Sequence, residues 1–332
     1  MSHIIEYKDL EPYSNDGRME LFICCASYEE RCITALRSST QNYRPKAVLI
    51  FYGKEFLLKG KCQEYKEKLK AFALGLTNQP ALEFVFETSK LGQCISKFRE
   101  AMRKIICDYP DIKVTLDITT FPRQTMFPVL HEIMKLVSEQ NFRILYTEPE
   151  KYSTENKDGW LTRGVRSVVP ILGYGGVQDP LLKKLLIMLP GHEGERAYIT
   201  WRRHQPDKTI LLRQGTPYHK GLNSISEREN ELLISMSGDV CLYEPRIPAR
   251  EIDGTFLELE KIYARYIHEY YFVVATLGTK LQALGFFLFA ESRPDLQISY
   301  AVPIHYNYDS YSIRYGKQWE IRNLDPYIRI DD

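Results

Sequence analysis

An acid, threonines, a proline and an arginine stand together in "DITTFPRQT", residues 117–125. The segment follows the apolar run "IKVTL" and precedes "MFPVLHEIMKLV", which has the pattern of a helix. A related segment, "TLGTKLQ" at 276–282, also lies between an apolar run and an apolar helix. Free N–H groups in a first helical turn attract anions, hydroxyls add donors, and Arg or Lys supplies a countercharge. Both segments suit loops that bind phosphate.

Residues of these two loops are the expected phosphate contacts: Thr119, Thr120, Arg123, Gly278, Thr279 and Lys280. A structural interpretation is also open, because Thr is a common N-cap, Pro122 suits a first helical turn and Asp117 can form an Asx turn. Because Arg123 and Lys280 stand at equivalent places in the two loops, we give the ligand hypothesis and the structural interpretation equal weight.

A second pair of loops carries arginines. Glu30 and Arg31 in "SYEER" match Glu195 and Arg196 in "HEGER". A cation in a first helical turn opposes the helix dipole by some tenths of a kcal/mol unless an anion lies nearby. We therefore consider Arg31 and Arg196 as ligand-binding residues, with an ion pair to a neighbouring Glu as the alternative.

Tyrosines follow the last strand expected in each series. Tyr146 lies in "YTEPEKYS", and "YAVPIHYNYDSYSIRYG" contains Tyr300, Tyr306, Tyr308 and Tyr311. An aromatic ring stacked on a base is worth on the order of 1 to 3 kcal/mol in nucleic-acid systems. Tyr is also a favourable strand residue. We take Tyr146 and Tyr300 as candidate base contacts, with a strand role as the alternative.

Apolar runs typical of buried strands position these loops, and helices of about ten or more residues alternate with the runs. The runs form two series, at 21–25, 46–53, 82–88, 112–118 and 142–149, and at 184–189, 208–215, 239–245, 271–280 and 296–303. This alternation predicts an α/β fold with mainly parallel sheets covered on both faces.

The two series resemble one unit used twice. Arg123 lies 92 residues after Arg31, and Lys280 lies 84 residues after Arg196. Shortened surface loops account for such a difference. We expect two tandem Rossmann-like three-layer halves from an internal duplication, with domains at 1–170 and 171–332. The alternative is that any doubly wound fold gives similar spacing.

Composition narrows the functional classes. The 332 residues include 44 Lys and Arg against 43 Asp and Glu, which gives no basic field for binding bulk duplex DNA. The seven scattered cysteines suit reduced thiols. No secretory or membrane-spanning pattern is evident. We expect a cytoplasmic protein that does not act on membranes.

Several cofactor and metal chemistries lack their motifs. Neither a P-loop nor a G-x-G-x-x-G occurs, and no His/Cys spacing typical of zinc is present. No nucleophile elbow of the form G-x-S-x-G occurs either. No cofactor and no metal are therefore expected.

The chain resembles the CARF domains (CRISPR-associated Rossmann fold), which sense oligonucleotide messengers in prokaryotic defence systems. The resemblance lies in "TLGTK" and "DITTFPR" after a fourth strand, together with "CASYEER" and "PGHEGER" after a first strand. It implies a nucleotide sensor for antiviral defence. CARF proteins generally pair two such domains from separate chains, whereas both would lie in one chain here. No HEPN-type R-x-x-x-x-H motif follows, so an effector protein is a candidate partner.

We therefore expect a regulatory protein that binds a nucleotide or short oligonucleotide through the strand–helix loops of both halves. One alternative is an enzyme that processes such a ligand, of a phosphodiesterase-like, nucleoside transferase or phosphoribosyltransferase-like kind, with Asp117 and Glu30 as candidate catalytic acid/base groups. Another alternative is a scaffold subunit with no small-molecule ligand.

Overall fold

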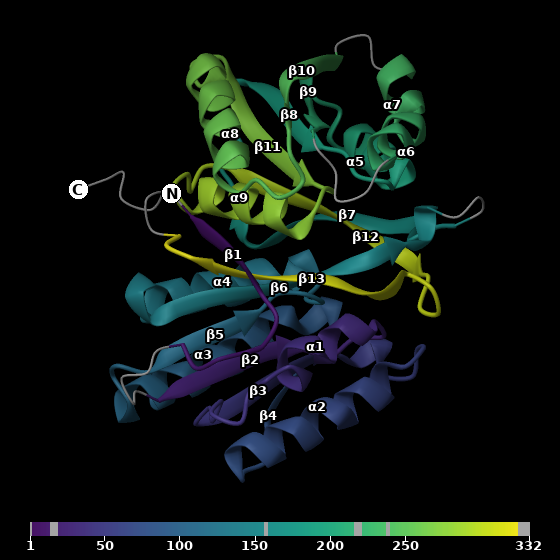
Figure 1. Ribbon diagram of the computed structural model, residues 1–332. Coiled ribbons are helices and arrows are strands. Elements are labelled where there is room, and N and C mark those ends of the chain that lie inside the picture. Colours follow the sequence, from purple (N-terminus) through teal and green to yellow (C-terminus); the bar gives the residue numbers. More distant parts are fainter. Residues whose placement is uncertain (1, 14–18, 156–158, 216–220, 237–239, 325–332) are drawn as a thin grey trace. The chain divides into compact units, whose positions relative to one another are not determined.

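The computed structural model describes residues 2–13, 19–155, 159–215, 221–236 and 240–324, and these fold into two units (Figure 1). Within the described residues, the first unit comprises 2–152 and 308–324, and the second comprises 153–307. Each unit contains one sheet with helices on both faces.

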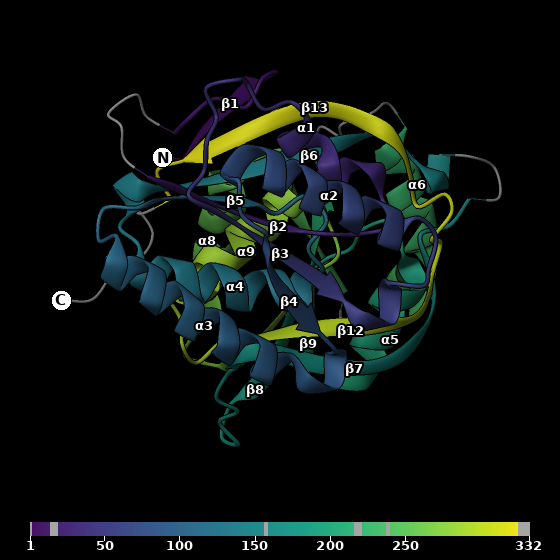
Figure 2. The ribbon, with the colours of Figure 1, turned by 90° about the horizontal axis from the view of Figure 1, so that it is seen from below.

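The first unit holds seven strands among the described residues. They are β1 (His3–Tyr7), β2 (Glu20–Cys25), β3 (Ala47–Gly53), β4 (Leu82–Phe86), β5 (Lys113–Asp117), β6 (Phe142–Tyr152) and β13 (Ser312–Arg322). Its helices are α1 (Thr34–Arg37), α2 (Cys62–Thr77), α3 (Leu91–Asp108) and α4 (Arg123–Leu136), with short 3-10 turns η1 (Glu30–Ile33), η2 (Lys54–Phe56), η3 (Thr88–Lys90) and η4 (Glu139–Asn141). Figure 2 shows α1 and α2 on one side of the central strands, and α3 and α4 on the other.

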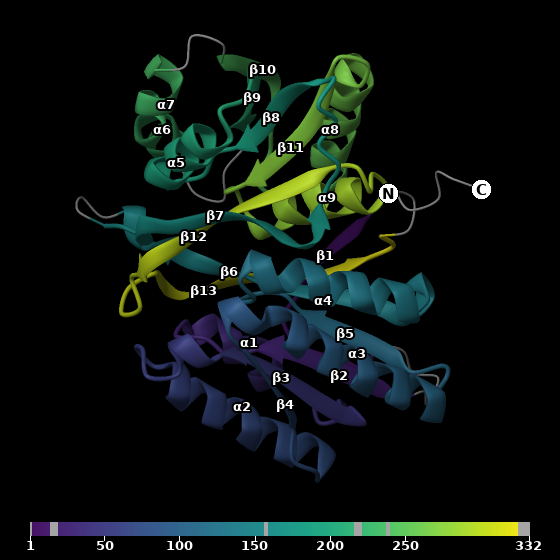
Figure 3. The same cartoon turned by 180° about the vertical axis from the view of Figure 1, so that it is seen from behind.

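The second unit holds six strands among the described residues. They are β7 (Thr162–Gly175), β8 (Lys183–Leu189), β9 (Lys208–Gln214), β10 (Val240–Ile247), β11 (Tyr270–Thr276) and β12 (Gln297–Tyr306). Its helices are α5 (Gly194–His204), α6 (Leu222–Glu229), α7 (Glu231–Met236), α8 (Asp253–Tyr266) and α9 (Lys280–Glu291), with one 3-10 turn, η5 (Ser153–Glu155). Figure 3 shows α8 and α9 on one side of this sheet, and α5, α6 and α7 on the other.

The two sheets share one strand order. The first runs β1-β13-β6-β5-β2-β3-β4 and the second runs β10-β9-β8-β11-β12-β7. Five parallel strands of the first sheet lie in the order β4-β3-β2-β5-β6, and five of the second lie in the order β10-β9-β8-β11-β12. When these strands are numbered along the chain, both orders are 3-2-1-4-5. The central pairings are parallel, for example Leu21 with Val114 between β2 and β5, and Leu186 with Val273 between β8 and β11. The expected α/β architecture of two halves with mainly parallel sheets is confirmed.

The two units exchange a strand. The strand that follows the last parallel strand of one sheet pairs antiparallel with the last parallel strand of the other sheet. In the chain β7 follows β6, yet it pairs with β12, where Val169 lies opposite Tyr300. In the same way β13 follows β12 but pairs with β6, where Trp319 lies opposite Tyr146. The units therefore do not divide between 170 and 171 as expected, since that boundary falls inside β7 and residues 308–324 belong to the first unit.

A buried guanidinium fastens the exchanged strand β13 to the first sheet. Arg143 of β6 donates from Nη1 to Glu320 of β13 and from Nη2 to Glu20 of β2, both at 2.9 Å. Burial alone would lower the pKa of Arg143, but the Glu20 carboxylate and its neighbours raise it above the ordinary value. Removing one partner would leave a buried charge uncompensated, so this cluster fixes where β13 can pair.

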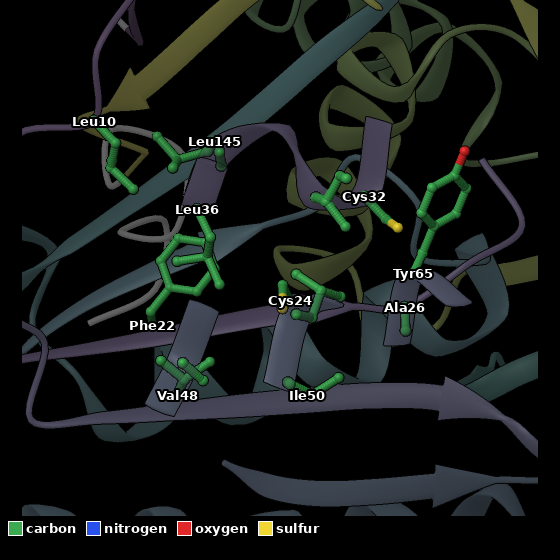
Figure 4. Close-up of a cluster of buried hydrophobic side chains, with 14 of the residues drawn as sticks. Leu10, Phe22, Cys24, Ala26, Cys32, Leu36, Val48, Ile50, Tyr65 and Leu145 are labelled. Carbon is green, nitrogen blue, oxygen red and sulfur yellow. The ribbon is translucent and has the colours of Figure 1, made fainter. Parts of the chain in front are cut away.

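Burial on both faces explains the continuous apolar sequences of β2 and β3. Period-two alternation places Phe22 and Cys24 on the same face, which α1 and α2 cover. Figure 4 shows them packed with Val48, Ile50 and Leu36. The opposite face contains Phe51, whose ring lies 5.1 Å from that of Phe98 in α3. A strand without a solvent face gives no polar alternation in the sequence.

The core of the second unit follows the same rule. On one face of its sheet, Leu186 and Met188 of β8 pack with Ala197 of α5. On the other face, Phe272 of β11 contacts Tyr263 of α8, with ring centroids 4.7 Å apart. Within the part of the chain that the structure describes, none of the helices has the length and apolarity needed to cross a membrane.

Candidate functional site

The loops singled out in the sequence lie at the topological switch point of each sheet. In the first sheet the strand order reverses between β2 and β5, and in the second between β8 and β11. The loops after these strands meet in each unit. The Thr120 hydroxyl donates to the Cys25 carbonyl at the end of β2 (2.6 Å), and the Leu277 amide donates to the Leu189 carbonyl at the end of β8 (2.9 Å). Open α/β sheets bind ligands at this position.

Arg123 and Lys280 occupy equivalent positions in the two units. Each is the first residue of the helix after the fourth parallel strand, α4 or α9, and each is partly exposed. A cation at this position can serve as the countercharge of an anion bound at the helix start.

The N-terminus of α4 is held by a hydrophobic anchor rather than a side-chain cap. Phe121 is 1% exposed, and its ring lies 5.3 Å from that of Phe51 in the core. Pro122 is the N-cap residue, outside the first helical turn where the sequence suggested it, and it makes no side-chain cap hydrogen bond. The Pro122 carbonyl accepts from the Thr125 amide at 2.9 Å, so this N-cap leaves only the first two amides of the helix, those of Arg123 and Gln124, to other partners.

The N-terminus of α9 has a full capping box. The Thr279 hydroxyl accepts from the Gln282 amide at 3.1 Å, and the Gln282 side chain accepts from the Thr279 amide at 3.0 Å. The Thr279 hydroxyl also donates to the Ala249 carbonyl at 2.6 Å. At Gly278 a Cβ would lie 2.5 Å from the Gln282 side-chain oxygen and 2.6 Å from a Leu189 methyl, so a larger residue there would displace these two side chains and disturb the capping box. The structural role considered for Thr279 is therefore present.

The remaining polar groups of the first loop hold its backbone. Asp117 is 2% exposed and accepts from the Thr119 amide at 2.9 Å, which forms the Asx turn considered from the sequence. The Thr119 hydroxyl accepts from the Thr147 amide of β6 at 2.9 Å. Thr119 and Thr120 therefore tie the loop to β6 and β2, and neither serves as the N-cap of α4. Asp117 is engaged within this turn.

Arg31 and Arg196 are buried and serve matching roles in the two units. Arg31 pairs with Glu29 at 2.7 Å and donates to the Thr147 carbonyl of β6 at 2.8 Å. Arg196 pairs with Glu193 at 2.7 Å and donates to the Ala301 carbonyl of β12 at 2.7 Å. The nearby anion is thus the neighbouring Glu, and each arginine ties the loop after the first parallel strand to the fifth.

Electrostatics agree with a bracing role for Arg31. Burial alone would lower its pKa, but the Glu29 carboxylate raises it above the ordinary value. The adjacent Glu30 forms a partly exposed pair with Arg37 at 2.9 Å. The two candidate acid/base groups, Asp117 and Glu30, therefore both have partners within the protein.

The candidate tyrosines lie inside their units. Tyr146 is 0% exposed and Tyr300 is 6% exposed. In the second unit, the Arg196 guanidinium lies 5.2 Å from the centroid of the Tyr300 ring. In the first unit, burial and the neighbouring Tyr146 raise the pKa of Tyr152 well above its ordinary value. A base could reach Tyr146 only if that side chain left the interior.

Other tyrosines line a pocket that the sequence did not identify. The pocket has a volume of about 160 Å³ and lies beside the "SYEER" loop of the first unit. The Tyr28 ring contacts the rings of Tyr308 and Tyr311, with centroids 5.1 and 5.9 Å apart. Lys61 and Arg314 also line it. Tyr308 and Tyr311 come here because β13 belongs to the first sheet, and no local sequence signal reports that pairing.

No group of three His, Cys, Asp or Glu side chains among the described residues could hold a metal ion. The described cysteines are free thiols, and all except Cys107 are buried. The side chain of Cys241 lies outside the described residues. Burial raises the pKa of Cys62 and of Cys94 to about 11 in each case.

No family model matches the chain, and no curated protein matches it. Among solved structures, the chain is similar to Enterococcus italicus Csm6 bound to cyclic hexa-2'-fluoro-hexa-dAMP. The identity is 13%, the match covers 40% of this chain, and the TM-score is 0.30. The match spans about a third of the Csm6 chain, at 35%.

Proposed function

We propose that this protein binds a phosphorylated nucleotide or short oligonucleotide through the strand–helix loops of both halves and acts as a sensor or regulatory subunit. One observation carries the proposal: in each unit a cation begins the helix that leaves the topological switch point, Arg123 in the first and Lys280 in the second. At a switch point the helices after neighbouring strands leave toward opposite faces, so a crevice forms outside the carboxyl ends of the strands.

The charge offered to a ligand comes from the loop after the fourth parallel strand. Arg31 and Arg196 are buried against Glu29 and Glu193, so their charges are balanced internally. Arg123 is partly exposed at the start of α4, a helix whose N-cap makes no side-chain bond. The helix dipole and this guanidinium both favour an anion there.

The two loops contribute unequally in this proposal. The third amide is engaged in both helices, since Gln282 donates to the Thr279 hydroxyl and Thr125 donates to the Pro122 carbonyl. The two loops differ in their cation, because Arg123 can bind a phosphate with two parallel hydrogen bonds, while Lys280 acts as a point charge. We expect the first half to supply more of the phosphate affinity.

The tyrosine-lined pocket of the first unit suits the base of such a ligand. Tyr28, Tyr308 and Tyr311 supply aromatic rings, and the charged lining consists of two cations, Lys61 and Arg314, and three carboxylates, Glu29, Glu30 and Asp309. Aromatic faces are the usual surface on which unpaired bases stack. These residues replace Tyr146 and Tyr300 as the expected base contacts, because they line a pocket instead of the interior.

The sensor role and the assignment to prokaryotic antiviral defence rest on the CARF-like loop sequences "TLGTK" and "DITTFPR". An effector protein that responds to the bound ligand is part of this proposal. Net charge of +1 gives no attraction to bulk duplex DNA, so sequence-independent duplex binding at physiological salt would contradict it.

Mass spectrometry of small molecules released from the purified protein identifies the ligand, and calorimetric titration then measures its affinity for variants. Arg123→Ala and Lys280→Ala should each weaken binding by roughly 10 to 150 fold, the range for charge-assisted hydrogen bonds. Lys135→Ala is the matched control, because Lys135 lies exposed in the last turn of the same helix as Arg123. Unchanged affinity in both loop variants would remove the basis of the proposal. Recovery of the added ligand as a product would favour the enzymatic alternative.

A further inference from the structure

Cations and tyrosines gather at the amino ends of β8, β9 and β11 in the second unit, the ends opposite the switch point. The strand pairing places Lys184 beside Tyr271, and Lys208 begins β9. The Lys184 ammonium donates to the His204 carbonyl at the end of α5 (2.6 Å), so the last turn of that helix reaches the same edge. We call this region the amino-end surface and define it as residues 183–184, 202–208 and 265–271.

The amino-end surface is strongly basic. Its carboxylates are Asp207 and Glu269, and its cations are Lys183, Lys184, Arg202, Arg203, Lys208 and Arg265. None of these cations forms an ion pair within the described part of the chain. The whole chain has a formal net charge of only +1, so this surface is far more basic than the average of the chain.

Structural roles account for part of this charge. Arg202, Arg203 and Arg265 lie in last helical turns, where the helix dipole favours a cation. Lys183 and Lys208 instead begin strands and gain nothing from a helix end.

A buried histidine reports the positive potential of this surface. Burial, together with the charges of Lys184 and Arg203, lowers the pKa of His204 to about 4. The two carboxylates therefore do not cancel the field of the cations.

Three partly exposed tyrosine rings lie among the cations: Tyr266, Tyr270 and Tyr271. Arg265 Cζ and Lys208 Nζ lie 5.3 and 5.4 Å from the centroid of the Tyr266 ring. The Tyr270 ring meets that of Tyr266 edge to face, with centroids 5.7 Å apart. Lys184 Nζ lies 5.9 Å from the centroid of the Tyr271 ring. Positive charge and accessible aromatic surface thus alternate along this edge.

Single-stranded nucleic acid fits this combination better than other polyanions. Its phosphates attract cations, and its unpaired bases stack on exposed aromatic rings. A duplex keeps its base faces stacked inside, so the tyrosines would add nothing to its binding. An acidic protein segment would use the charges and leave the rings without a base to stack on them.

We propose that the amino-end surface of the second unit binds single-stranded nucleic acid, with Lys183, Lys208 and Arg265 on phosphates and Tyr266 on a base. The inference goes beyond the nucleotide site proposed above. It concerns the opposite ends of the strands and uses neither Arg123 nor Lys280.

Fluorescence anisotropy of the full chain with a labelled 12-nucleotide oligothymidylate and with a labelled 12-base-pair duplex tests the proposal. We expect the single strand to bind at least about fivefold more tightly, since stacking of one base contributes roughly 5 to 150 fold. The logarithm of Kd should rise with that of the salt concentration with a slope of about 2, because each of three neutralised phosphates contributes about 0.7. No binding of the strand, or equally tight binding of the duplex, would overturn the proposal.

Variants whose folding is checked by thermal unfolding test the location. Lys208→Ala and Arg265→Ala should each lower the salt slope by about 0.7. Tyr266→Leu should weaken strand binding by roughly 5 to 150 fold and leave the slope unchanged, because it removes a ring and no charge. Unchanged strand binding in all three variants would overturn the assignment to this surface.

Arg166→Ala is the matched control for Arg265→Ala. Arg166 is exposed and forms no ion pair among the described residues, but it lies on β7, which β12 separates from β11. An equal effect of Arg166→Ala would mean that net charge alone drives binding, and it would overturn the proposed location.

The double variant Arg123→Ala, Lys280→Ala separates this inference from the nucleotide site. We expect it to retain strand binding. Loss of strand binding would place the strand at the switch-point loops and overturn the present proposal. Failure of the nucleotide proposal would instead appear as unchanged nucleotide affinity in the same variant, so the two failures are distinguishable.

Discussion

Replacing Arg31 by Ala should lower the free energy of unfolding of the first unit by about 3 to 5 kcal/mol, the cost of breaking a buried ion pair by removing one partner. The side chains of Arg31 and Glu29 are 5% and 8% exposed. Arg31 donates to Glu29 Oε2 from Nε at 3.2 Å and from Nη2 at 2.7 Å. It also donates to the Thr147 carbonyl at 2.8 Å. The substitution removes all three bonds and leaves the Glu29 charge in the interior.

Arg37→Ala is the matched control for this prediction. Arg37 pairs with Glu30 at 2.9 Å, but the two side chains are 35% and 38% exposed, so its loss should cost less than about 1 kcal/mol. Urea unfolding measures both changes. With a slope of about 2 kcal/mol per molar urea, the midpoint should fall by about 2 M for Arg31→Ala and by under 0.5 M for Arg37→Ala.

The double variant Arg31→Ala, Glu29→Gln identifies the cause of the loss. It should recover part of the stability, because it leaves no uncompensated buried charge. The structural role of Arg31 is refuted if the free energy of unfolding of Arg31→Ala lies within about 1 kcal/mol of the wild-type value and ligand binding is weaker. Arg31 would then be a ligand contact.

Further predictions concern pH, capping and thiol reactivity. Burial lowers the pKa of His192 and of His204 to about 4, below the ordinary 6.5. The folded state therefore favours neutral imidazoles, so stability should be full above about pH 6.5 and fall as the pH approaches 4, and variants with Gln at both positions should show a flatter profile in thermal unfolding. Thr279→Ala should cost about 1 kcal/mol in urea unfolding through loss of the capping box, while Thr279→Ser should cost little. Among the described cysteines, Cys107 should react first with a thiol reagent in the folded protein, and buried Cys62 should react only on unfolding. An aromatic disulfide reagent measures both reactions, because it releases a coloured thiolate whose absorbance is recorded over time.

The central strands could be predicted from the sequence because both of their faces are buried. Runs such as "LFICC" in β2 and "VLIFY" in β3 contain few polar residues, and such runs are typical of parallel sheets. The outer strands gave no such signal. In β7 the alternation is interrupted by Pro170, and in β13 "RYGKQWEIR" is largely polar. The partner of β13 is β6, more than 150 residues earlier, and no local pattern encodes that pairing.

Residue type located the candidate loops but did not decide their chemistry. Arg31 is the second residue of η1, and Arg123 is the first residue of α4. Both helical segments follow a parallel strand, so the sequence predicts ligand binding for both arginines. Their difference is burial, since Arg31 is 4% exposed and Arg123 is partly exposed. Burial depends on how β6 covers the loop, which is a property of the assembled sheet.

The exchange of β7 and β13 sets the order in which the protein can mature during synthesis. The edge of β6 needs β13, and the ribosome reaches residue 322 only after it has made the whole second unit. At roughly 5 to 20 residues per second, translation leaves that edge unpaired for on the order of ten to thirty seconds. An open strand edge is a template for pairing with another chain, so a nascent chain of this protein is exposed to mispairing throughout that interval. The second sheet has β7 at hand before β12 emerges, and it can therefore close as soon as its own strands are complete.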